Sequence, residues 1–317
     1  MKKCILIINP NSGRDLNKAY LFEYQKILLK YGYETIVYFT KCQHHATEII
    51  ETLPNEVDLV ISMGGDGTFN EVVTGNMKRE HKLLLSHIPV GTTNDVGAMF
   101  GYGKDPIKNL KSALDGVVKG IDICTINGKP FVYVAGFGKF MNISYETPRE
   151  LKSKIGQLAY ILEGAKDLVN PTPLYKITYT ADGVTKKGEY SFMLISNANR
   201  IAGINNIYKD VFLNDNKFEV VLCNLTKKSE VIKSLYYLAT SKMKQAKGFE
   251  FLKVSNLEIE FEKDFKNSWC LDGEEYNINT NKFKIEIVND FNILIPKKNV
   301  KKIFEEKNEN KLSTRTR

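Results

Sequence analysis

The chain has 317 residues, of which 43% are hydrophobic and 26% are charged, so it is long enough for two domains with large cores and has an ordinary globular composition. No run of about 18 apolar residues occurs, which excludes a transmembrane helix. The five cysteines are widely spaced and form neither a disulfide framework nor a zinc pattern, so a reducing compartment is favoured. Eight basic and three acidic residues in 297–317 supply +5 of the net charge of +8, so the remainder does not require a nucleic-acid partner.

Predicted strands and helices alternate through residues 1–125. The apolar run at 4–8 is continuous, as is typical of a parallel strand that is covered on both faces. Further strands are expected at 34–39, 58–62, 87–90 and from 121, and helices at 16–31, 46–53, 69–73, 96–100 and 106–116. This alternation predicts a doubly wound α/β layer that binds ligands at the carboxyl ends of its strands.

The predicted strand at 58–62 ends in the segment Gly64-Gly65-Asp66-Gly67. Glycines let the backbone turn sharply and bring N–H groups close to a ligand, and the following helix adds the positive end of its dipole, so a phosphate is the expected ligand. A carboxylate repels phosphate unless a cation lies between them, so Asp66 predicts a nucleotide–metal complex. The alternative is a glycine-rich turn with a capping aspartate.

Two other strand ends carry similar loops. Residues 9–13 (Asn-Pro-Asn-Ser-Gly) and Arg14 offer backbone N–H groups and a guanidinium group to phosphates, although Arg14 also fits a surface position at a helix start. Residues 91–95 (Gly-Thr-Thr-Asn-Asp) can hydrogen-bond a nucleotide, cap the next helix, or do both.

From residue 129 onward the pattern changes to strands with few helices between them. Strands are expected at 131–135, 175–180, 189–196, 217–223, 257–261, 266–271, 283–288 and 291–295, and helices at 149–168 and 228–246. Asp182-Gly183 is a hairpin signal. We therefore predict a second domain of β-sandwich type at residues 126–296, after an α/β domain at residues 1–125.

Asp272-Gly273-Glu274 places two carboxylates one residue apart across a glycine. An alcohol that attacks a phosphate must lose its proton, and a carboxylate within hydrogen-bond reach can accept it. Two such carboxylates can converge on one site only in a turn. Judged on this motif alone, a hairpin turn with exposed acids is the simpler hypothesis.

Taken together and in this order, the blocks at 9–13, 64–71, 89–95 and 272–274 resemble the bacterial soluble diacylglycerol kinase family, which is related to sphingosine kinases and NAD kinases. The stretch at 144–160 is also similar to that family, and the resemblance spans about residues 4 to 296. It implies an NAD-kinase-like fold in which 297–317 return to the first domain. It also implies that Glu274 is the general base and that Asp272 orients it or shares the proton.

The resemblance further assigns the ATP contacts. These would be Asn9, Pro10, Asn11, Ser12, Gly13, Thr40, Gly65, Asp66, Gly67, Thr68, Phe69, Asn70, Glu71 and Thr92, and we add Arg14 from its position. An acidic residue at the position of Asp122 lies in the nucleotide–metal network of the family, whereas the residue alone fits a surface site in a strand.

The family also holds a structural Mg²⁺ on one aspartate and two main-chain carbonyl groups, which correspond here to Asp215, Phe212 and Lys217. This chain has Asp215-Asn216 where the family usually has Asp-Gly, and asparagine tolerates the left-handed turn conformation. Judged on sequence alone, Asn214-Asp215-Asn216 is an ordinary turn.

The function implied by the resemblance is an ATP- and Mg²⁺-dependent lipid kinase that converts diacylglycerol to phosphatidic acid. Alternatives are a kinase for phosphatidylglycerol, a sphingoid base or a polyol, and a catalytically inactive nucleotide-binding regulator. The expected setting is cytoplasmic, with transient contact at the inner face of the membrane, and the family includes homodimers. The basic tail at 297–317 can attract anionic lipid with about 1 kcal/mol per well-placed charge, or can simply be solvated.

Overall fold

The computed structural model describes residues 1–12, 20–138, 173–201, 204–205, 210–227, 230, 248–263, 265 and 268–305. The helix expected at 149–168 lies outside the described residues, as do Gly13, Arg14, most of the tail at 297–317 and, apart from residue 230, the helix expected at 228–246. Among the helices that the structure describes, none combines the length and apolar character needed to span a bilayer.

The first part of the chain forms a parallel sheet with strand order β2-β1-β3-β4. Its strands are β1 (Lys2–Ile8), β2 (Tyr33–Phe39), β3 (Leu59–Gly64) and β4 (Leu85–Pro89). The intervening helices are α2 (Leu21–Lys30), α3 (His45–Thr52), α4 (Asp66–Lys78), α5 (Asp95–Met99) and α6 (Pro106–Leu114). Each expected strand and helix of this part is present, with bounds that differ by a few residues.

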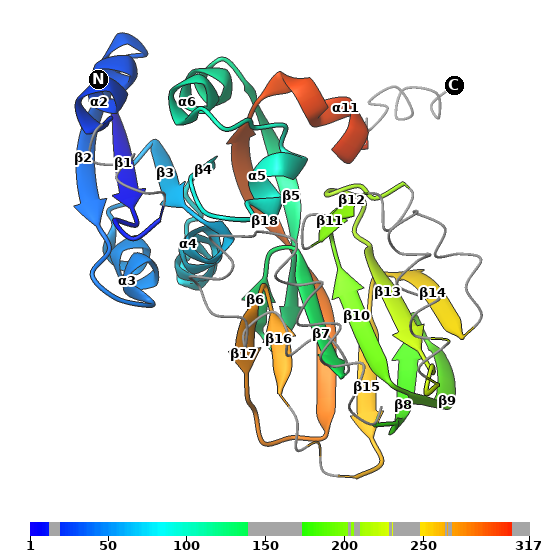
Figure 1. Cartoon of the computed structure of the whole chain (residues 1–317). Helices are drawn as coiled ribbons and strands as arrows, with labels where there is room; N and C mark the ends of the chain where they lie inside the picture. Colours follow the sequence, from blue (N-terminus) through cyan, green and yellow to red (C-terminus); the bar gives the residue numbers. More distant parts are fainter. Residues whose placement is uncertain are drawn as a thin grey trace, which may run out of the picture.

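Helices cover both faces of this parallel sheet (Figure 1). Successive residues of β1 point to opposite faces. Cys4, Leu6 and Ile8 therefore share a core with α2 and α6. Ile5 and Ile7 share another core with α3 and α4. The doubly wound α/β layer predicted from the continuous apolar strand is confirmed.

The second part is built from antiparallel strands. They are β5 (Val117–Ile126), β6 (Lys129–Phe131), β7 (Val134–Gly138), β8 (Tyr175–Ala181), β9 (Val184–Tyr190), β10 (Phe192–Ser196), β11 (Arg200–Ile201), β12 (Ile204–Asn205), β13 (Phe218–Cys223), β14 (Phe249–Val254), β15 (Leu257–Phe261), β16 (Trp269–Leu271), β17 (Glu274–Tyr276) and β18 (Lys282–Ile295). The chain continues into the 3₁₀ turn η2 (Lys297–Asn299) and α11 (Val300–Ile303).

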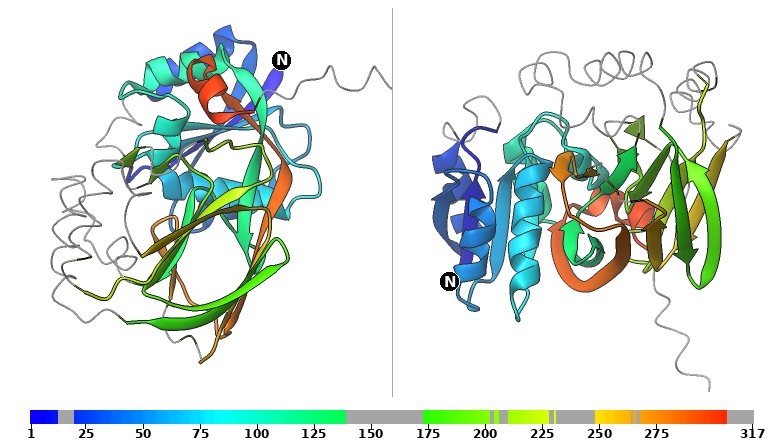
Figure 2. Two further views of the ribbon diagram at one scale, coloured as in Figure 1. Left: turned by 90° about the vertical axis from the view of Figure 1, so that its right-hand side faces the viewer. Right: turned by 90° about the horizontal axis from the view of Figure 1, so that it is seen from below.

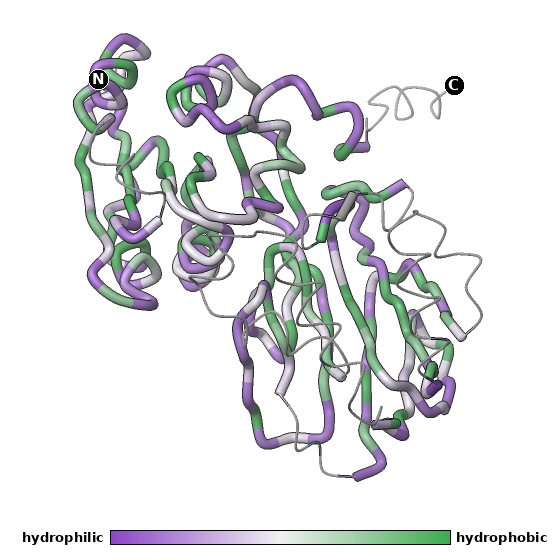
Figure 3. Tube along the Cα trace, in the orientation of Figure 1, coloured by the Kyte–Doolittle hydropathy of each residue, from purple (hydrophilic) through white to green (hydrophobic). Residues whose placement is uncertain are grey.

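Two curved sheets face each other in this second part (Figure 2). One has the order β14-β13-β10-β7-β16-β17, and the other continues from the parallel sheet through β18, β15, β8 and β9. Hydrophobic and hydrophilic residues alternate along strands such as β15, so that one side of each strand enters the core (Figure 3). The core between the sheets is rich in aromatic rings, among them Phe137, Trp269 and Phe283. The antiparallel β domain is as predicted.

The strand β18 passes through both parts of the molecule. The sequence suggested two strands, because Asn289 and Asp290 interrupt the apolar pattern, but the structure has one strand with a register shift between Val288 and Phe291. Beyond this bulge, Ile293 pairs with Leu85 of β4 in parallel. The chain thus returns to the α/β part within β18, before residue 297. The domain boundary expected at residue 125 stays a prediction.

The strands that the sequence did not predict are short, polar or at a sheet edge: β9, β11, β12, β14 and β17. The hairpin expected at Asp182-Gly183 is confirmed, since Ala181 pairs with Val184 across a turn with φ of 44° and 85°. Its second strand is β9, whose Lys186 and Lys187 suit an exposed edge.

His87 of β4 makes the stability of the fold depend on pH. Its Nδ1 lies 2.9 Å from Ser62 Oγ, and burial lowers its pKa to about 3. Below pH 6.5 the unfolded chain takes up a proton that the folded chain does not, so stability falls as the pH falls. Between pH 7 and pH 5 this amounts to about 2 kcal/mol. In urea unfolding, the wild type should lose that much more stability than His87→Phe, and equal losses would contradict this role.

Candidate active site

Loops that follow β1, β3 and β4 meet at one edge of the parallel sheet. Asn9 N donates to Met63 O at 2.9 Å, and Val90 N donates to Gly64 O at 2.8 Å. A Cβ at Gly91 would lie 2.5 Å from the Cα of Gly65, so this backbone contact requires glycine at position 91. The sequence blocks at 9–13, 64–71 and 89–95 are therefore neighbours in space, as expected for carboxyl ends of parallel strands.

The loop after β1 is fastened to the first turn of α4. Asn9 Nδ2 donates to Thr68 Oγ1 at 3.2 Å, and Asn9 Oδ1 accepts from Asn11 N at 2.9 Å. Ser12 N closes the turn by donating to Asn9 O at 3.1 Å. One asparagine thus holds together two loops predicted to bind phosphate.

The strand–turn–helix arrangement predicted for the glycine-rich segment is present. The chain passes from β3 through Gly65 directly into α4, a helix of 13 residues, and Gly65 provides no side-chain cap. Helix N-termini without side-chain caps leave backbone N–H groups for an anion. The N-terminus of α4 lacks a side-chain cap, as the predicted phosphate contact requires.

Asp66, the first residue of α4, is buried and caps another helix. Its two carboxyl oxygens accept from Asp95 N at 2.9 Å and Val96 N at 3.1 Å, at the start of α5. Burial and the nearby Asp95 raise the pKa of Asp66 to about 7, although these two hydrogen bonds act in the opposite direction. Asp66 therefore caps α5, while its own backbone begins α4 directly after the glycine-rich turn.

Arg200 is a residue that sequence reasoning missed. It comes from β11, and its Nε donates to Asp95 Oδ1 at 2.9 Å, with the Arg200 side chain 20% exposed and that of Asp95 1%. Arg200 and Asp95 are 105 positions apart in the sequence, so their contact follows only from the fold. The pair joins the β part to the helix that Asp66 caps.

Three predicted nucleotide contacts on α4 have side chains with other partners. Phe69 is fully buried, with its ring centroid 4.9 Å from that of His87. Asn70 Nδ2 donates to Asp272 Oδ2 at 2.6 Å, and Glu71 Oε2 accepts from Ala46 N at 3.1 Å. The ring of Phe69 belongs to the core, and its N–H donates to Gly65 O at 3.3 Å. Two further predicted contacts lie nearby: Thr40 directly after β2 is half-buried, and Thr92 after β4 is exposed.

Asp272-Gly273 is the two-residue turn of the β16–β17 hairpin, with φ of 50° and 89° and Leu271 paired with Glu274. The Asp272 side chain is buried, not exposed. Its carboxylate accepts from the backbone N–H groups of Val132 at 2.6 Å, Tyr133 at 3.0 Å and Val134 at 3.0 Å.

Together with the bond from Asn70, four hydrogen bonds therefore hold the Asp272 carboxylate. Burial raises the pKa of Asp272 above its usual value, although all four bonds act in the opposite direction. A carboxylate so fully engaged is suited to fixing the hairpin in place.

The Glu274 side chain is exposed, whereas that of Asp272 is buried. Glu274 lies beside the N-terminus of α4. A Cβ on Gly67 would lie 3.7 Å from Glu274 Oε1. The other carboxyl oxygen, Oε2, accepts from Gln43 Nε2 at 2.9 Å. Gln43, in the turn between β2 and α3, is a second residue that sequence reasoning missed, because 231 positions separate it from its partner.

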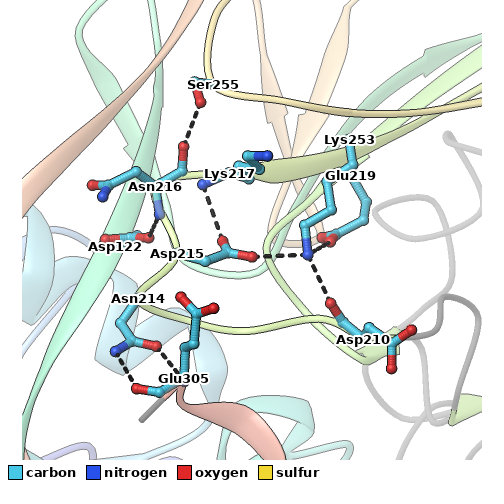
Figure 4. Close-up of polar contacts among 10 residues, drawn as sticks. All are labelled: Asp122, Asp210, Asn214, Asp215, Asn216, Lys217, Glu219, Lys253, Ser255 and Glu305. Carbon is cyan, nitrogen blue, oxygen red and sulfur yellow. Dashed lines mark hydrogen bonds and ion pairs between the residues drawn. The ribbon is translucent and has the colours of Figure 1, made fainter. Parts of the chain in front are cut away.

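Asp122 lies on β5 and contacts the turn that was predicted to bind metal. Asp122 Oδ2 accepts from Asn216 N at 2.7 Å (Figure 4). Asn216 has φ of 57°, so the left-handed conformation expected of it is present. The carboxylate of Asp215 accepts from Lys217 N at 3.1 Å and lies 2.8 Å from Lys253 Nζ.

Within the described part of the chain, no three His, Cys, Asp or Glu side chains gather closely enough to hold a metal ion. A nucleotide-associated Mg²⁺ would in any case take most of its ligands from phosphates and water. A cation beside Asp66 would oppose the rise in the pKa of this carboxyl group that burial and Asp95 cause. The Asp215 carboxylate fits one poorly, because an ammonium group already neutralises it.

Sequence relatives identify the family. The family model described as Diacylglycerol kinase catalytic domain matches residues 3–126 of this chain. A diacylglycerol kinase of Bacillus subtilis (strain 168) is 35% identical over 235 residues, which cover 74% of this chain and 77% of that protein. A diacylglycerol kinase of Staphylococcus aureus (strain Newman) is 33% identical over 232 residues, which cover 73% of each chain.

Solved structures share the fold. A crystal structure from Bacillus anthracis str. Sterne, described as that of a diacylglycerol kinase, superposes with a TM-score of 0.76 at 23% identity and covers 93% of this chain and 97% of that one. Another crystal structure from the same organism has a TM-score of 0.80 at 24% identity, with coverage of 93% and 95%. The α/β domain with its antiparallel β domain, and hence the NAD-kinase-like fold, is confirmed, and by its sequence relatives the chain belongs to the diacylglycerol kinase family.

Proposed function

We propose that this protein is an ATP-dependent lipid kinase that transfers the γ-phosphate to the primary hydroxyl of diacylglycerol and so forms phosphatidic acid. The observation that carries the proposal is the position of Glu274, an exposed carboxylate beside Gly67 at the N-terminus of α4. A phosphate held by that helix end would lie next to a group able to take a proton from an attacking alcohol.

The protein's part in phosphoryl transfer is to position the phosphates and neutralise their charge. We assign the ATP contacts to the strand-end loops at 9–13, 65–71 and 91–92, together with Arg14 and Thr40. The hydrogen bond from Asn9 to Thr68 joins the first two of these loops, and the close backbone contact of Gly65 with Gly91 joins the second to the third. Mg²⁺ bound to the phosphates would supply positive charge there, and Asp66 is the carboxylate best placed to face it. Asp122 acts more remotely, through the turn at 212–217.

The two carboxylates of the Asp-Gly-Glu turn have separate roles in this proposal. Glu274 accepts the proton of the lipid hydroxyl as the oxygen attacks phosphorus. Asp272 fixes the turn through its bonds to Val132, Tyr133, Val134 and Asn70, which come from both parts of the molecule. Of the two roles predicted for Asp272, orienting Glu274 therefore has more support than sharing its proton.

The acceptor would be a lipid alcohol taken from a membrane surface by transient contact. The lipid side of the proposal rests on the named relatives, which are diacylglycerol kinases at 33% to 35% identity. A peripheral position at the inner face of the membrane and a homodimer remain predictions from the family resemblance.

Transfer from γ-labelled ATP with Mg²⁺ tests the acceptor. Diacylglycerol, phosphatidylglycerol, a sphingoid base and glycerol would be offered in separate mixed-micelle assays. We expect label in phosphatidic acid at a rate at least tenfold above that for the other acceptors. Faster transfer to another alcohol would keep the kinase and replace the acceptor. ATP binding without transfer to any alcohol would support the inactive-regulator alternative.

Gln43 should affect catalysis through Glu274. Gln43→Ala removes the 2.9 Å bond that orients the Glu274 carboxylate, so kcat should fall by about three- to tenfold, which corresponds to one hydrogen bond of about 1 kcal/mol, with little change in the KM for ATP. Steady-state kinetics measure both constants. Gln43→Glu, which places a like charge beside Glu274, should lower kcat further. If both variants kept wild-type kcat, Gln43 would have no positioning role.

A further inference from the structure

The ammonium group of Lys253 is surrounded by oxygen atoms from the turn at 210–219 (Figure 4). Its Nζ lies 2.8 Å from Asp215 Oδ2 and 3.4 Å from Glu219 Oε1, and it donates to the backbone oxygen of Asp210 at 2.7 Å. The ring of Phe212 adds a cation–π contact at 5.7 Å from Nζ to the ring centroid. These four contacts form a complete set of partners for one positive charge.

The acidic side chains of this group are shielded from water. Asp215 is 10% exposed and Glu219 is 5% exposed, whereas the Lys253 side chain is 33% exposed. Two buried carboxylates need a counter-charge, because burying an unpaired charge is costly. The Lys253 ammonium group, 2.8 Å from Asp215 and 3.4 Å from Glu219, supplies this counter-charge.

The residues predicted to hold a structural Mg²⁺ take part in this arrangement. Phe212 and Asp215 both contact Lys253, and Lys217 N occupies the remaining oxygen of Asp215 at 3.1 Å. An Mg²⁺ ion on Asp215 would lie within a few ångströms of the ammonium group, where repulsion between the cations opposes binding. The Asp215 carboxylate, the charged member of the predicted ligand set, therefore fits the ammonium group better than a second cation.

We propose that Lys253 is the resident cation of this turn and takes the place of the structural Mg²⁺ that the family resemblance implies for Phe212, Asp215 and Lys217. Lys253 lies on β14, and the turn precedes β13, so the cation comes from a neighbouring strand of the same sheet. This inference does not depend on the identity of the lipid acceptor or on the nucleotide.

The turn that Lys253 stabilises joins three regions of the molecule. Leu213 O accepts from Asp122 N at 2.7 Å, and Asn216 N donates to the Asp122 carboxylate at 2.7 Å, which fixes the turn on β5. Asn214 Oδ1 accepts from Glu305 N at 2.8 Å, just beyond α11, and Ser255 Oγ donates to Asn216 O at 2.7 Å, just beyond β14. A fixed cation there holds β5, β14 and the segment after α11 to one turn.

Removal of the lysine charge gives the first test. Lys253→Met keeps most of the side-chain length but leaves Asp215 and Glu219 without a counter-charge. In nucleotide-free protein with EDTA, Lys253→Met should lower the Tm by about 3–6 °C, as expected when a partly buried charge loses its partner. The matched control is Lys282→Met, whose lysine lies 3.2 Å from Glu260 at an exposed site and should shift Tm by about 1 °C or less. Equal shifts in the two variants would overturn the proposal.

Metal binding gives the second test and needs only variants of Asp215. Mn²⁺, counted by electron paramagnetic resonance in nucleotide-free protein, should bind at the same number of sites in the wild type and in Asp215→Asn. The wild-type Tm should also differ by less than about 1 °C between EDTA and 10 mM Mg²⁺. A Mn²⁺ site present in the wild type and lost in Asp215→Asn would overturn the proposal and restore the metal at this turn.

Discussion

Glu274→Gln should lower kcat for lipid phosphorylation by about 10²- to 10⁴-fold, the range expected when a general base is removed. The substitution keeps the size of the side chain and the possibility of a hydrogen bond with Gln43, but an amide cannot accept the hydroxyl proton. ATP contacts lie on other loops, so the Kd for ATP should stay within about twofold of the wild-type value. Steady-state kinetics in mixed micelles and isothermal titration with ATP would measure the two quantities.

Glu275→Gln is the matched control for this prediction. Glu275 is the next residue on β17 and is also exposed, but in the β16–β17 hairpin it pairs with Cys270. Successive side chains of a strand point to opposite faces, so Glu275 points away from the side that Glu274 shares with Gly67. Its kcat should remain within about twofold of wild type. A loss below tenfold in Glu274→Gln, or similar losses in both variants, would contradict the assignment of the base.

Asp272→Ala should combine a large loss of stability with a loss of activity. It removes the acceptor of three buried backbone N–H groups and of the Asn70 amide. An unsatisfied buried donor costs about 1–3 kcal/mol, and partial relaxation of the hairpin makes about 3–5 kcal/mol a reasonable total. Because the same hairpin carries Glu274, kcat should fall as well. Urea unfolding and the kinase assay, applied to the same preparation, measure both effects.

A second Asp-Gly hairpin in the same chain provides the control. The Asp182 carboxylate also accepts backbone N–H groups, from Ser255 at 3.0 Å and Asn256 at 2.9 Å, but this turn is exposed and distant in sequence from the site. Asp182→Ala should cost about 1 kcal/mol and leave kcat unchanged. If Asp272→Ala were no less stable than Asp182→Ala yet inactive, Asp272 would act in the chemistry and not as an anchor.

Local patterns in the sequence were sufficient for most of the fold. The strand at 4–8, the helix after Gly65 and the Asp182-Gly183 hairpin follow from hydrophobic periodicity and turn residues, which act over short stretches of chain. β18 could not be predicted as one strand, because Asn289 and Asp290 resemble a turn until the partner strands β4, β5 and β15 are known. A bulge that bends one strand between two domains has no local signal that distinguishes it from a loop.

The candidate site was predictable as a set of loops, but the partners of its side chains were not. The Asp-Gly-Glu motif alone favoured a hairpin turn with two exposed acids. The hairpin is present, but the structure buries Asp272 and exposes only Glu274, because the turn lies against residues 132–134. Gln43, Arg200 and Lys253 each contact a residue far away in the sequence. The contacts of Gln43 and Arg200 depend on how the two parts of the molecule meet. The contact of Lys253 depends on which strands are neighbours in one sheet, and no local pattern encodes either.

Following the γ-phosphate itself tests the central claim most directly. Phosphorus NMR of a mixed-micelle reaction containing ATP, Mg²⁺ and diacylglycerol would identify the product without assuming its nature. We predict that a phosphomonoester resonance of phosphatidic acid grows in step with ADP in the wild type and is absent with Glu274→Gln. Inorganic phosphate as the only product, or the same lipid product at the same rate with Glu274→Gln, would contradict the account of this site.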